Sequence, residues 1–139
     1  MKIDPIKNGI VIDHIEAGKG MEVYNILNLS ELDCMIALIK NVPSKKTGKK
    51  DIIKIDASVA LDLDVLGYIA PEATVNFIEN GALVKKSKVA LPETVKNVIK
   101  CKNPRCITSV EQGIDQVFKL VDKENRVYRC IYCESKAKD

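Results

Sequence analysis

Four cysteines in two close pairs constrain the fold of this chain more than any other feature of its sequence. Four residues separate Cys101 from Cys106, two separate Cys130 from Cys133, and 23 residues lie between the pairs. Two such pairs on separate turns can place four sulfur atoms at the corners of a tetrahedron, which is the geometry of structural Zn²⁺ sites. The spacing therefore predicts one structural zinc ion bound by these four thiolates.

Other uses of these cysteines are also compatible with the spacing. Two disulfides are one alternative, although disulfides are rare in the cytoplasm. An iron site needs the same ligands, and a redox pair at Cys130 and Cys133 would be typical of a βαβ setting without an upstream pair. We favour zinc, and because four thiolates fill its coordination shell, we expect the metal to hold shape and to perform no chemistry. The fifth cysteine, Cys34, lies in an apolar run and is expected to be a buried small hydrophobe.

The segment around the cysteines predicts a small β domain. Residues 116–121 and 126–132 alternate between apolar and polar, as strands do, and a polar turn lies between them. About 39 residues bury too little surface to fold without the metal. We place the domain boundary between residues 1–92 and 93–139, with a connector helix at about 92–100 that a proline opens.

The patterns of the first hundred residues predict a second, larger domain. β-Branched runs indicate strands at 9–16, 34–42 and 50–56, and apolar spacing indicates helices at 18–31 and 57–71. A hairpin over 73–91 turns at Asn80-Gly81, a strong turn dipeptide. The order βαββαββ predicts an α+β fold, a ferredoxin-like βαββαβ sandwich with one added strand, followed by the four-cysteine zinc-bound β domain.

Composition and charge exclude several classes of function. The formal net charge is +3, from 14 basic and 13 acidic residues in 1–100 and from 8 and 6 in 101–139. Zinc with four thiolates adds a net −2 to the second part, so that part is less basic than a zinc ribbon that binds nucleic acid. No apolar run approaches the roughly 20 residues of a membrane span, and the N-terminus lacks signal-peptide features. We expect a cytoplasmic protein without nucleic-acid or membrane partners.

The chain offers no catalytic motif, but one sheet face carries a polar set. There is one histidine, and no complete dinucleotide or phosphate-binding glycine loop. Strand alternation puts Lys54 on the same face as Ile52, and Thr74 on the same face as Asn76 and Ile78. With Asp13, His14 and the lysines of 85–88, this set suits a nucleoside triphosphate. The alternatives are a solvated sheet face for each lysine and a local hydrogen bond at a strand end for His14.

The segments IKNGIVIDHI, KKDIIKID, APEATVNFIEN, VKKSKVALPE and VIKCKNPRCI…CIYCE run in this order over nearly the whole chain. On these segments the chain resembles the regulatory chain of aspartate carbamoyltransferase. The resemblance implies a nucleotide-binding allosteric domain, a zinc domain and no catalytic activity. It also implies homodimers formed through the N-terminal domains, which bridge trimers of a separate catalytic chain, and a zinc domain that contacts that chain. The expected effectors are CTP, ATP and, in an assisting role, UTP.

The resemblance also assigns roles to residues. Asp13 matches the acid that contacts the ribose, His14 and Lys86 match positions near the triphosphate, and Lys54 matches the lysine that bridges base, ribose and phosphate. The remaining matches are the base-reading backbone at Ile3, Asp4, Pro5 and Ile6, the pocket lining at Val11, Asn76, Ile78 and Leu83, and a basic position tied to UTP or metal effects at Lys50. Two departures leave the effector preference open: Gly81 replaces a bulkier residue beside the base, and Pro5 removes one backbone N–H.

Two rival interpretations remain from the sequence. A zinc-ribbon nucleic-acid or transcription accessory protein would bind RNA or DNA in a salt-sensitive way. The near-neutral metal domain and the 4% aromatic content disfavour it. A stand-alone, ACT-like nucleotide sensor would bind CTP without any zinc-dependent partner.

Overall fold

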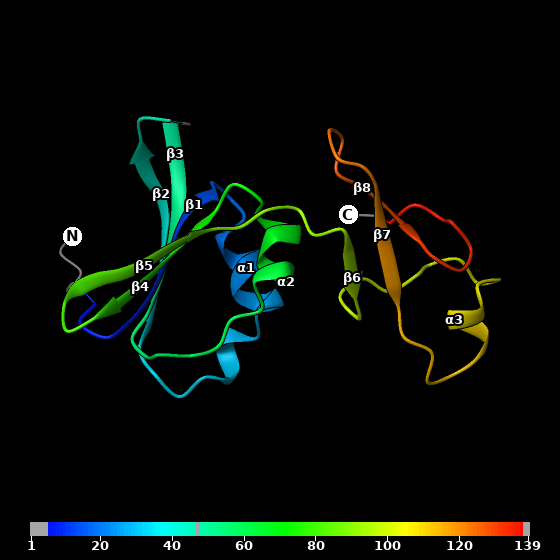
Figure 1. Ribbon diagram of the computed structural model, residues 1–139, viewed down its shortest axis with the longest axis horizontal. Helices are drawn as coiled ribbons and strands as arrows, with labels where there is room; N and C mark the ends of the chain where they lie inside the picture. Colours follow the sequence, from blue (N-terminus) through cyan, green and yellow to red (C-terminus); the bar gives the residue numbers. More distant parts are fainter. Residues whose placement is uncertain (1–5, 47, 138–139) are drawn as a thin grey trace. The chain divides into compact units, whose positions relative to one another are not determined.

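The computed structural model describes residues 6–46 and 48–137 and divides the chain into two compact units, residues 1–90 and 91–139 (Figure 1). No helix of the described residues is both long and apolar enough to cross a membrane.

The described residues of unit 1 form five strands and two α-helices. Its elements are, in order, β1 (Gly9–Glu16), α1 (Gly20–Ile26), the 3-10 helix η1 (Leu29–Glu31), β2 (Ile36–Ser44), β3 (Gly48–Ile55), α2 (Leu63–Ile69), β4 (Thr74–Glu79) and β5 (Ala82–Lys88). The antiparallel sheet has the strand order β2-β3-β1-β4-β5. The first four strands thus have the ferredoxin-like arrangement, and β5 is the added edge strand. The predicted fold class is confirmed.

The helices cover one face of this sheet, and the core lies between the two layers (Figure 1). Every second residue of β3, and of β1 up to Ile12, points into the core, for example Ile10 and Ile12 in β1 and Ile53 and Ile55 in β3, and all four are almost fully buried. The residues between them lie on the opposite face, which we call the open face. The alternation read from the sequence is therefore confirmed for these strands.

α2 is shorter than the helix predicted over 57–71. It begins at Leu63 because the Asp62 carboxylate accepts hydrogen bonds from the backbone N–H groups of Asp64 and Val65, as an N-cap does. Gly67 of α2 lies directly against the backbone carbonyl of Ala90, where a Cβ atom would clash with the carbonyl oxygen. The last residue of unit 1 is therefore packed onto this helix.

A fully buried carboxylate, that of Asp51 in β3, joins three segments of unit 1. Its Oδ2 accepts from the N–H groups of Gly18 at 3.1 Å and Gly20 at 2.9 Å, and its Oδ1 accepts from the N–H of Asn41 at 3.0 Å. Gly18 and Gly20 lie where the chain passes from β1 into α1. Asn41 lies in a bulge of β2, where the register shifts between Ile39 and Val42.

A second bulge lies in β1, on the other side of β3. The register between β1 and β3 shifts between Ile12 and Ile15, so Asp13 and His14 accommodate one extra residue. His14 has φ 58°, as does Asn41 in the β2 bulge. Both bulges thus place a non-glycine residue in the left-handed region, which the surrounding structure must support.

Unit 2 is built on a three-stranded antiparallel sheet. Its elements are β6 (Thr94–Lys96), α3 (Ile107–Val110), β7 (Val117–Asp122) and β8 (Val127–Cys130), and the strand order is β6-β7-β8. Both strands expected between the cysteine pairs are present. Its buried apolar side chains, apart from cysteines, are those of Val95, Phe118 and Tyr128, and the Tyr128 hydroxyl donates to the Pro92 carbonyl at 2.6 Å.

The expected connector helix at about 92–100 is wrong, because this segment contains strand β6. Thr94 and Val95 are β-branched and suit a strand, and pairing with β7 places Val95 opposite Phe118 in the core. Asn97 then takes φ 57°, and its side chain accepts from the N–H of Gln116. Pairing of β6 with β7 therefore outweighs the helix-like spacing of apolar residues in this segment.

We expect Asp51→Asn to destabilise unit 1 by about 2–4 kcal/mol, because an amide cannot accept all three buried N–H groups. Native-state amide hydrogen exchange of the zinc-loaded chain at Ile10, Ile12 and Ile53 reports this loss. Asp56→Asn is the matched control, since Asp56 is exposed and its replacement is expected to change stability by less than about 0.5 kcal/mol. Unchanged protection in Asp51→Asn would show that the carboxylate is dispensable.

Candidate functional site

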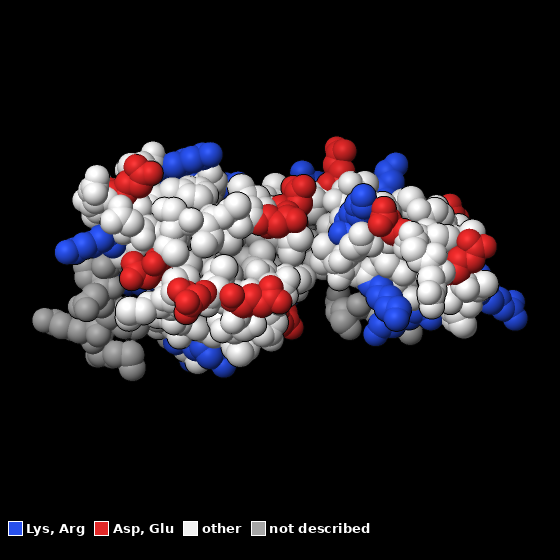
Figure 2. Space-filling model, turned by 90° about the horizontal axis from the view of Figure 1, so that it is seen from below, with Lys and Arg blue, Asp and Glu red and all other residues white. Residues whose placement is uncertain are grey.

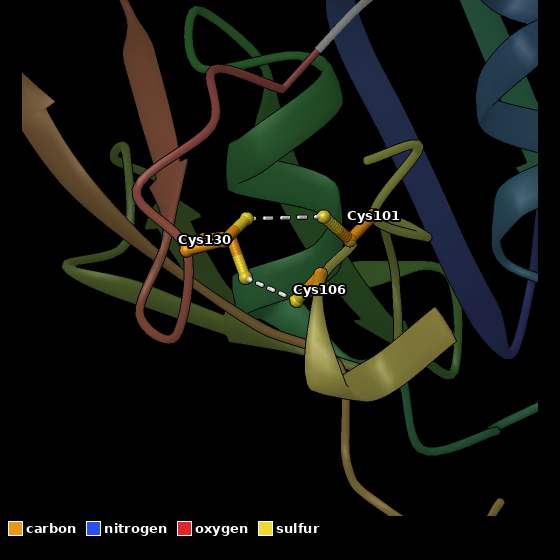
Figure 3. A group of neighbouring side chains, drawn as sticks. Cys101, Cys106 and Cys130 are labelled. Atoms are coloured by element: carbon orange, nitrogen blue, oxygen red, sulfur yellow. Dashed lines mark hydrogen bonds between the residues drawn. The ribbon is translucent and has the colours of Figure 1, made fainter. Parts of the chain in front are cut away.

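The four cysteines of unit 2 form one cluster. Cys101 precedes the turn into α3, Cys106 is the residue before α3, and Cys130 ends β8. Figure 3 shows Cys101, Cys106 and Cys130 pointing toward one another. The Sγ atoms of Cys101 and Cys133 lie 3.6 Å apart, those of Cys106 and Cys130 lie 3.7 Å apart, and all four lie within 4.8 Å of one another.

These distances fit a tetrahedral metal site. Zn–S bonds of about 2.3 Å at tetrahedral angles separate the sulfur atoms by about 3.8 Å. All five cysteines are free thiols, so the two disulfides considered above are absent. The four side chains can thus hold one Zn²⁺, whose chemical contribution is to fix the turns of unit 2.

Hydrogen-bond donors around the cluster favour thiolates at two positions. Hydrogen bonds from the side chain and backbone of Ser135 lower the pKa of Cys133 to about 6. The Thr108 hydroxyl donates to the Cys106 sulfur at 3.2 Å and lowers the pKa of that thiol. Burial raises the pKa of Cys101 to about 12, so there the metal must displace a proton. Thr108 and Ser135 were not among the residues predicted from the sequence, although each lies two residues after a cysteine.

The open face of unit 1 carries the other predicted site. Backbone pairing places Val11 opposite both Lys54 and Asn76, and Asn76 opposite Lys86. These four residues therefore form one row across β3, β1, β4 and β5. Ile78 and Leu83 pair with each other in the neighbouring row. The structure thus brings together residues from four strands that are up to 75 positions apart in the sequence.

A second row holds the polar groups at the β1 bulge. The Lys50 Nζ atom lies 3.0 Å from Asp13 Oδ1, and Asp13 is paired with Thr74 across β1 and β4. Nδ1 of His14 lies 3.1 Å from the Thr74 hydroxyl, which holds the imidazole ring. Thr74 was read from the alternation as a member of this face, and its contact with His14 gives it a supporting role.

Neighbouring groups stabilise the negative charge of the Asp13 carboxylate. Burial by itself raises the pKa of this carboxyl, but hydrogen bonds from Lys50 and from the backbone N–H of His14 outweigh burial and leave the pKa below its ordinary value. A depressed folded-state pKa stabilises the fold at pH values above the unfolded pKa. That contribution is lost as the pH falls through the folded pKa.

Asn76 contributes an acceptor to the open face. Its Oδ1 atom is buried and has no hydrogen-bond donor among the described residues. A buried acceptor without a partner costs free energy, so such groups are normally satisfied by water or a ligand. Ile6 contacts Gly9 at the start of β1. Ile3, Asp4 and Pro5, expected to read the base, lie outside the described residues.

Comparison with known proteins matches each of the two units to a family model. A family model described as aspartate carbamoyltransferase regulatory chain, allosteric domain, matches residues 1–90, and one described as its metal binding domain matches residues 93–139. The chain belongs to the aspartate carbamoyltransferase regulatory chain family. It is therefore a non-catalytic subunit with an allosteric and a metal-binding domain.

Relatives of this family match over nearly the whole chain. The regulatory chain of Clostridium botulinum is 54% identical over 134 residues, which cover 96% of this chain and 92% of the relative. That of Clostridium acetobutylicum is 53% identical over the same shares. The regulatory chain of Bifidobacterium longum is 46% identical over 138 residues, or 99% of each chain. The resemblance read from the sequence motifs is thus confirmed.

We expect Cys133→Ser to lower zinc affinity by well over tenfold, the loss that follows even from removing an outer partner of a ligand. Native mass spectrometry reports the zinc content, and amide exchange at Phe118 and Tyr128 reports the folding of unit 2. Cys34→Ser is the control, because Cys34 packs against the core of unit 1. A Cys133→Ser chain that retains one zinc ion at full affinity would contradict the four-ligand site.

Proposed function

We propose that this chain is the subunit through which nucleotides control aspartate carbamoyltransferase. In this proposal CTP and ATP, with UTP in an assisting role, bind the open face of unit 1, and unit 2 with its zinc ion binds a separate catalytic chain. Homodimers formed through the N-terminal domains bridge catalytic trimers in the cytoplasm. The observation that carries the proposal is the row of Lys54, Val11, Asn76 and Lys86 in a chain of this family.

The chemistry of the open face supports a nucleotide as the ligand. The Asp13 carboxylate can accept from ribose hydroxyls, and its ion pair with Lys50 keeps it charged. The amino groups of Lys54 and Lys86 supply point charges for phosphates. The unpartnered Oδ1 of Asn76 offers an acceptor for a hydroxyl or amino donor. Half-buried apolar neighbours, Val11 and Ile78, suit the flat faces of a base or sugar.

The charge distribution supports a protein partner over a nucleic acid. On the face shown in Figure 2, acidic and basic side chains are interspersed over both units, and no continuous basic stripe crosses them. Several residues close in sequence to the cysteines have exposed apolar side chains, namely Ile107, Val110, Ile131 and Tyr132. Such groups beside a rigid metal cluster suit a protein interface.

The effectors must act by binding two states of the assembly with different affinity. Coupling between two sites is typically about 1–3 kcal/mol, and a nucleotide that contacts both states equally shifts nothing. We infer that the signal passes from the open face through residues 91–100 to the metal unit. This order follows the chain, and coupling measurements are its test.

Assembly with a catalytic chain tests the proposed partner. We expect this chain, mixed with the catalytic chain from the same organism, to form a large complex with zinc present and none after the zinc is removed, because the metal shapes the binding unit. Size-exclusion chromatography with light scattering measures the masses. Separate elution of two zinc-loaded, folded chains would refute the assignment of the partner.

Lys54→Ala tests the nucleotide site. We expect at least a tenfold loss of CTP affinity, since a hydrogen bond to a charged group contributes about 1.5–3 kcal/mol, and loss of the CTP effect on activity in the complex. Assembly should be unchanged, because Lys54 lies on the open face of unit 1. Lys40→Ala, an exposed lysine of β2, is the control. A normal CTP response in Lys54→Ala would remove this residue from the site.

A further inference from the structure

A cavity of about 290 Å³ lies beside the cysteine cluster of unit 2. Two segments that are far apart in the sequence line it, residues 100–103 before α3 and residues 135–137 after β8, together with Phe118 of β7. Three of the lining residues are lysines, namely Lys100, Lys102 and Lys136. Neither the predicted metal site nor the family resemblance gives these lysines a role.

The charge of this cavity favours an anion. The described residues that line it include no aspartate or glutamate. The ion pairs formed among the described residues include none with Lys100, Lys102 or Lys136, and all three lysines are exposed. Like charges gathered around a concave site raise the local concentration of anions.

The metal centre offsets this positive charge only in part. Zn²⁺ with four thiolates carries a net charge of −2, and one of its ligands, Cys101, lines the cavity. The three lysines carry +3, so the cavity and the metal centre together have a net charge of +1. Lysines that only balanced the thiolates would leave no such excess, and the excess is available to a ligand.

The shape of the cavity depends on the metal, because the two segments meet at the cysteine cluster. The Sγ atom of Cys101, in the first segment, lies 3.6 Å from that of Cys133. Cys133 in turn accepts hydrogen bonds from Ser135, in the second segment. A zinc ion bound to both sulfur atoms therefore holds Lys100 and Lys102 at the same cavity as Lys136. Without the ion, the two segments lose this link.

The size and the donors of the cavity indicate the class of ligand. Ligand pockets usually have volumes of about 300–1,000 Å³, so a cavity at the lower end of this range suits a small anion better than a nucleotide. Lysine ammonium groups act as point charges that bind phosphate, and each has three donors. Three ammonium groups at one place favour a phosphate group over a single carboxylate, because phosphate carries more charge and more acceptor atoms.

We propose that Lys100, Lys102 and Lys136 form a binding site for a small phosphate anion in the metal unit, and that this site exists only in the zinc-loaded chain. All of its residues belong to unit 2, so it is distinct from the proposed nucleotide site of unit 1. Binding must then be reciprocal: an anion that binds only the zinc-loaded form raises the affinity of the chain for zinc by the same linkage.

Titration of the zinc-loaded full chain with inorganic phosphate, at constant ionic strength and followed by backbone amide NMR shifts, tests the site. We expect saturable shifts at residues 100–103 and 135–137, and none there after the zinc is removed. The double variant Lys100→Ala/Lys136→Ala should bind phosphate about tenfold or more weakly, because it loses two charged donors. Lys119→Ala/Lys123→Ala is the matched control. It removes the same charge from exposed lysines of unit 2 that do not line the cavity, and it should bind phosphate within about twofold of the wild type.

Competition for zinc with a chromogenic chelator tests the linkage. At a phosphate concentration ten times its dissociation constant, the apparent zinc affinity of the wild type should rise about tenfold over that in chloride of equal ionic strength. The variant Lys100→Ala/Lys136→Ala should show no such rise.

Three results would overturn the proposal. Shifts that spread over the lysines of the whole chain without saturating would indicate an adventitious ion only. Equal phosphate binding with and without zinc would refute the metal-dependent site. Weaker zinc binding in Lys100→Ala/Lys136→Ala with unchanged phosphate affinity would show that these lysines only balance the thiolates. None of these results bears on the nucleotide site, which Lys54→Ala tests separately.

Discussion

The geometry of unit 1 depends on one buried carboxylate. Asp51 has no solvent exposure, and a charge in that position is tolerable only because three backbone N–H groups point at it. These donors belong to the turn after β1 and to the β2 bulge, so the carboxylate of β3 ties both neighbouring strands to β3. The two bulges on either side of β3 need such support, because His14 and Asn41 both hold left-handed backbone conformations.

Asp51 is linked to the candidate nucleotide site because it lies in the same strand, β3, as two lysines of that site. Asp51 faces the helices, whereas its neighbour Lys50 lies on the open face and pairs with Asp13 in the β1 bulge. The same strand carries Lys54 four residues after Lys50. Strand β3 thus carries Asp51, the buried acceptor that supports the bulges, and two lysines of the candidate site, Lys50 and Lys54. In unit 2, four cysteines that can hold a metal supplement a small core, since the described residues bury Val95, Phe118 and Tyr128 beside the cysteines.

Much of this organisation could be predicted from the sequence, and the misses have physical causes. The cysteine spacing and the strand alternation depend on local geometry, so they indicated the metal cluster and the open face directly. The segment at Thr94 and Val95 was taken for a helix, because its assignment depends on pairing with β7, which no local pattern records. The bulge at His14 and the approach of Lys46 to β5 depend on strand register and hairpin closure. The sequence shows that His14 and Lys46 are present, but it does not show that they lie close together in the fold.

The contact between Gly67 and Ala90 has a mechanical consequence. The last residue of unit 1 leaves no room for a side chain at this point of α2, so the chain departs from a fixed anchor on the helix layer. α2 packs against the same sheet whose opposite face carries the candidate nucleotide site, and its Leu66 is fully buried in that core. A shift of the sheet would therefore displace the anchor, and with it the origin of the linker.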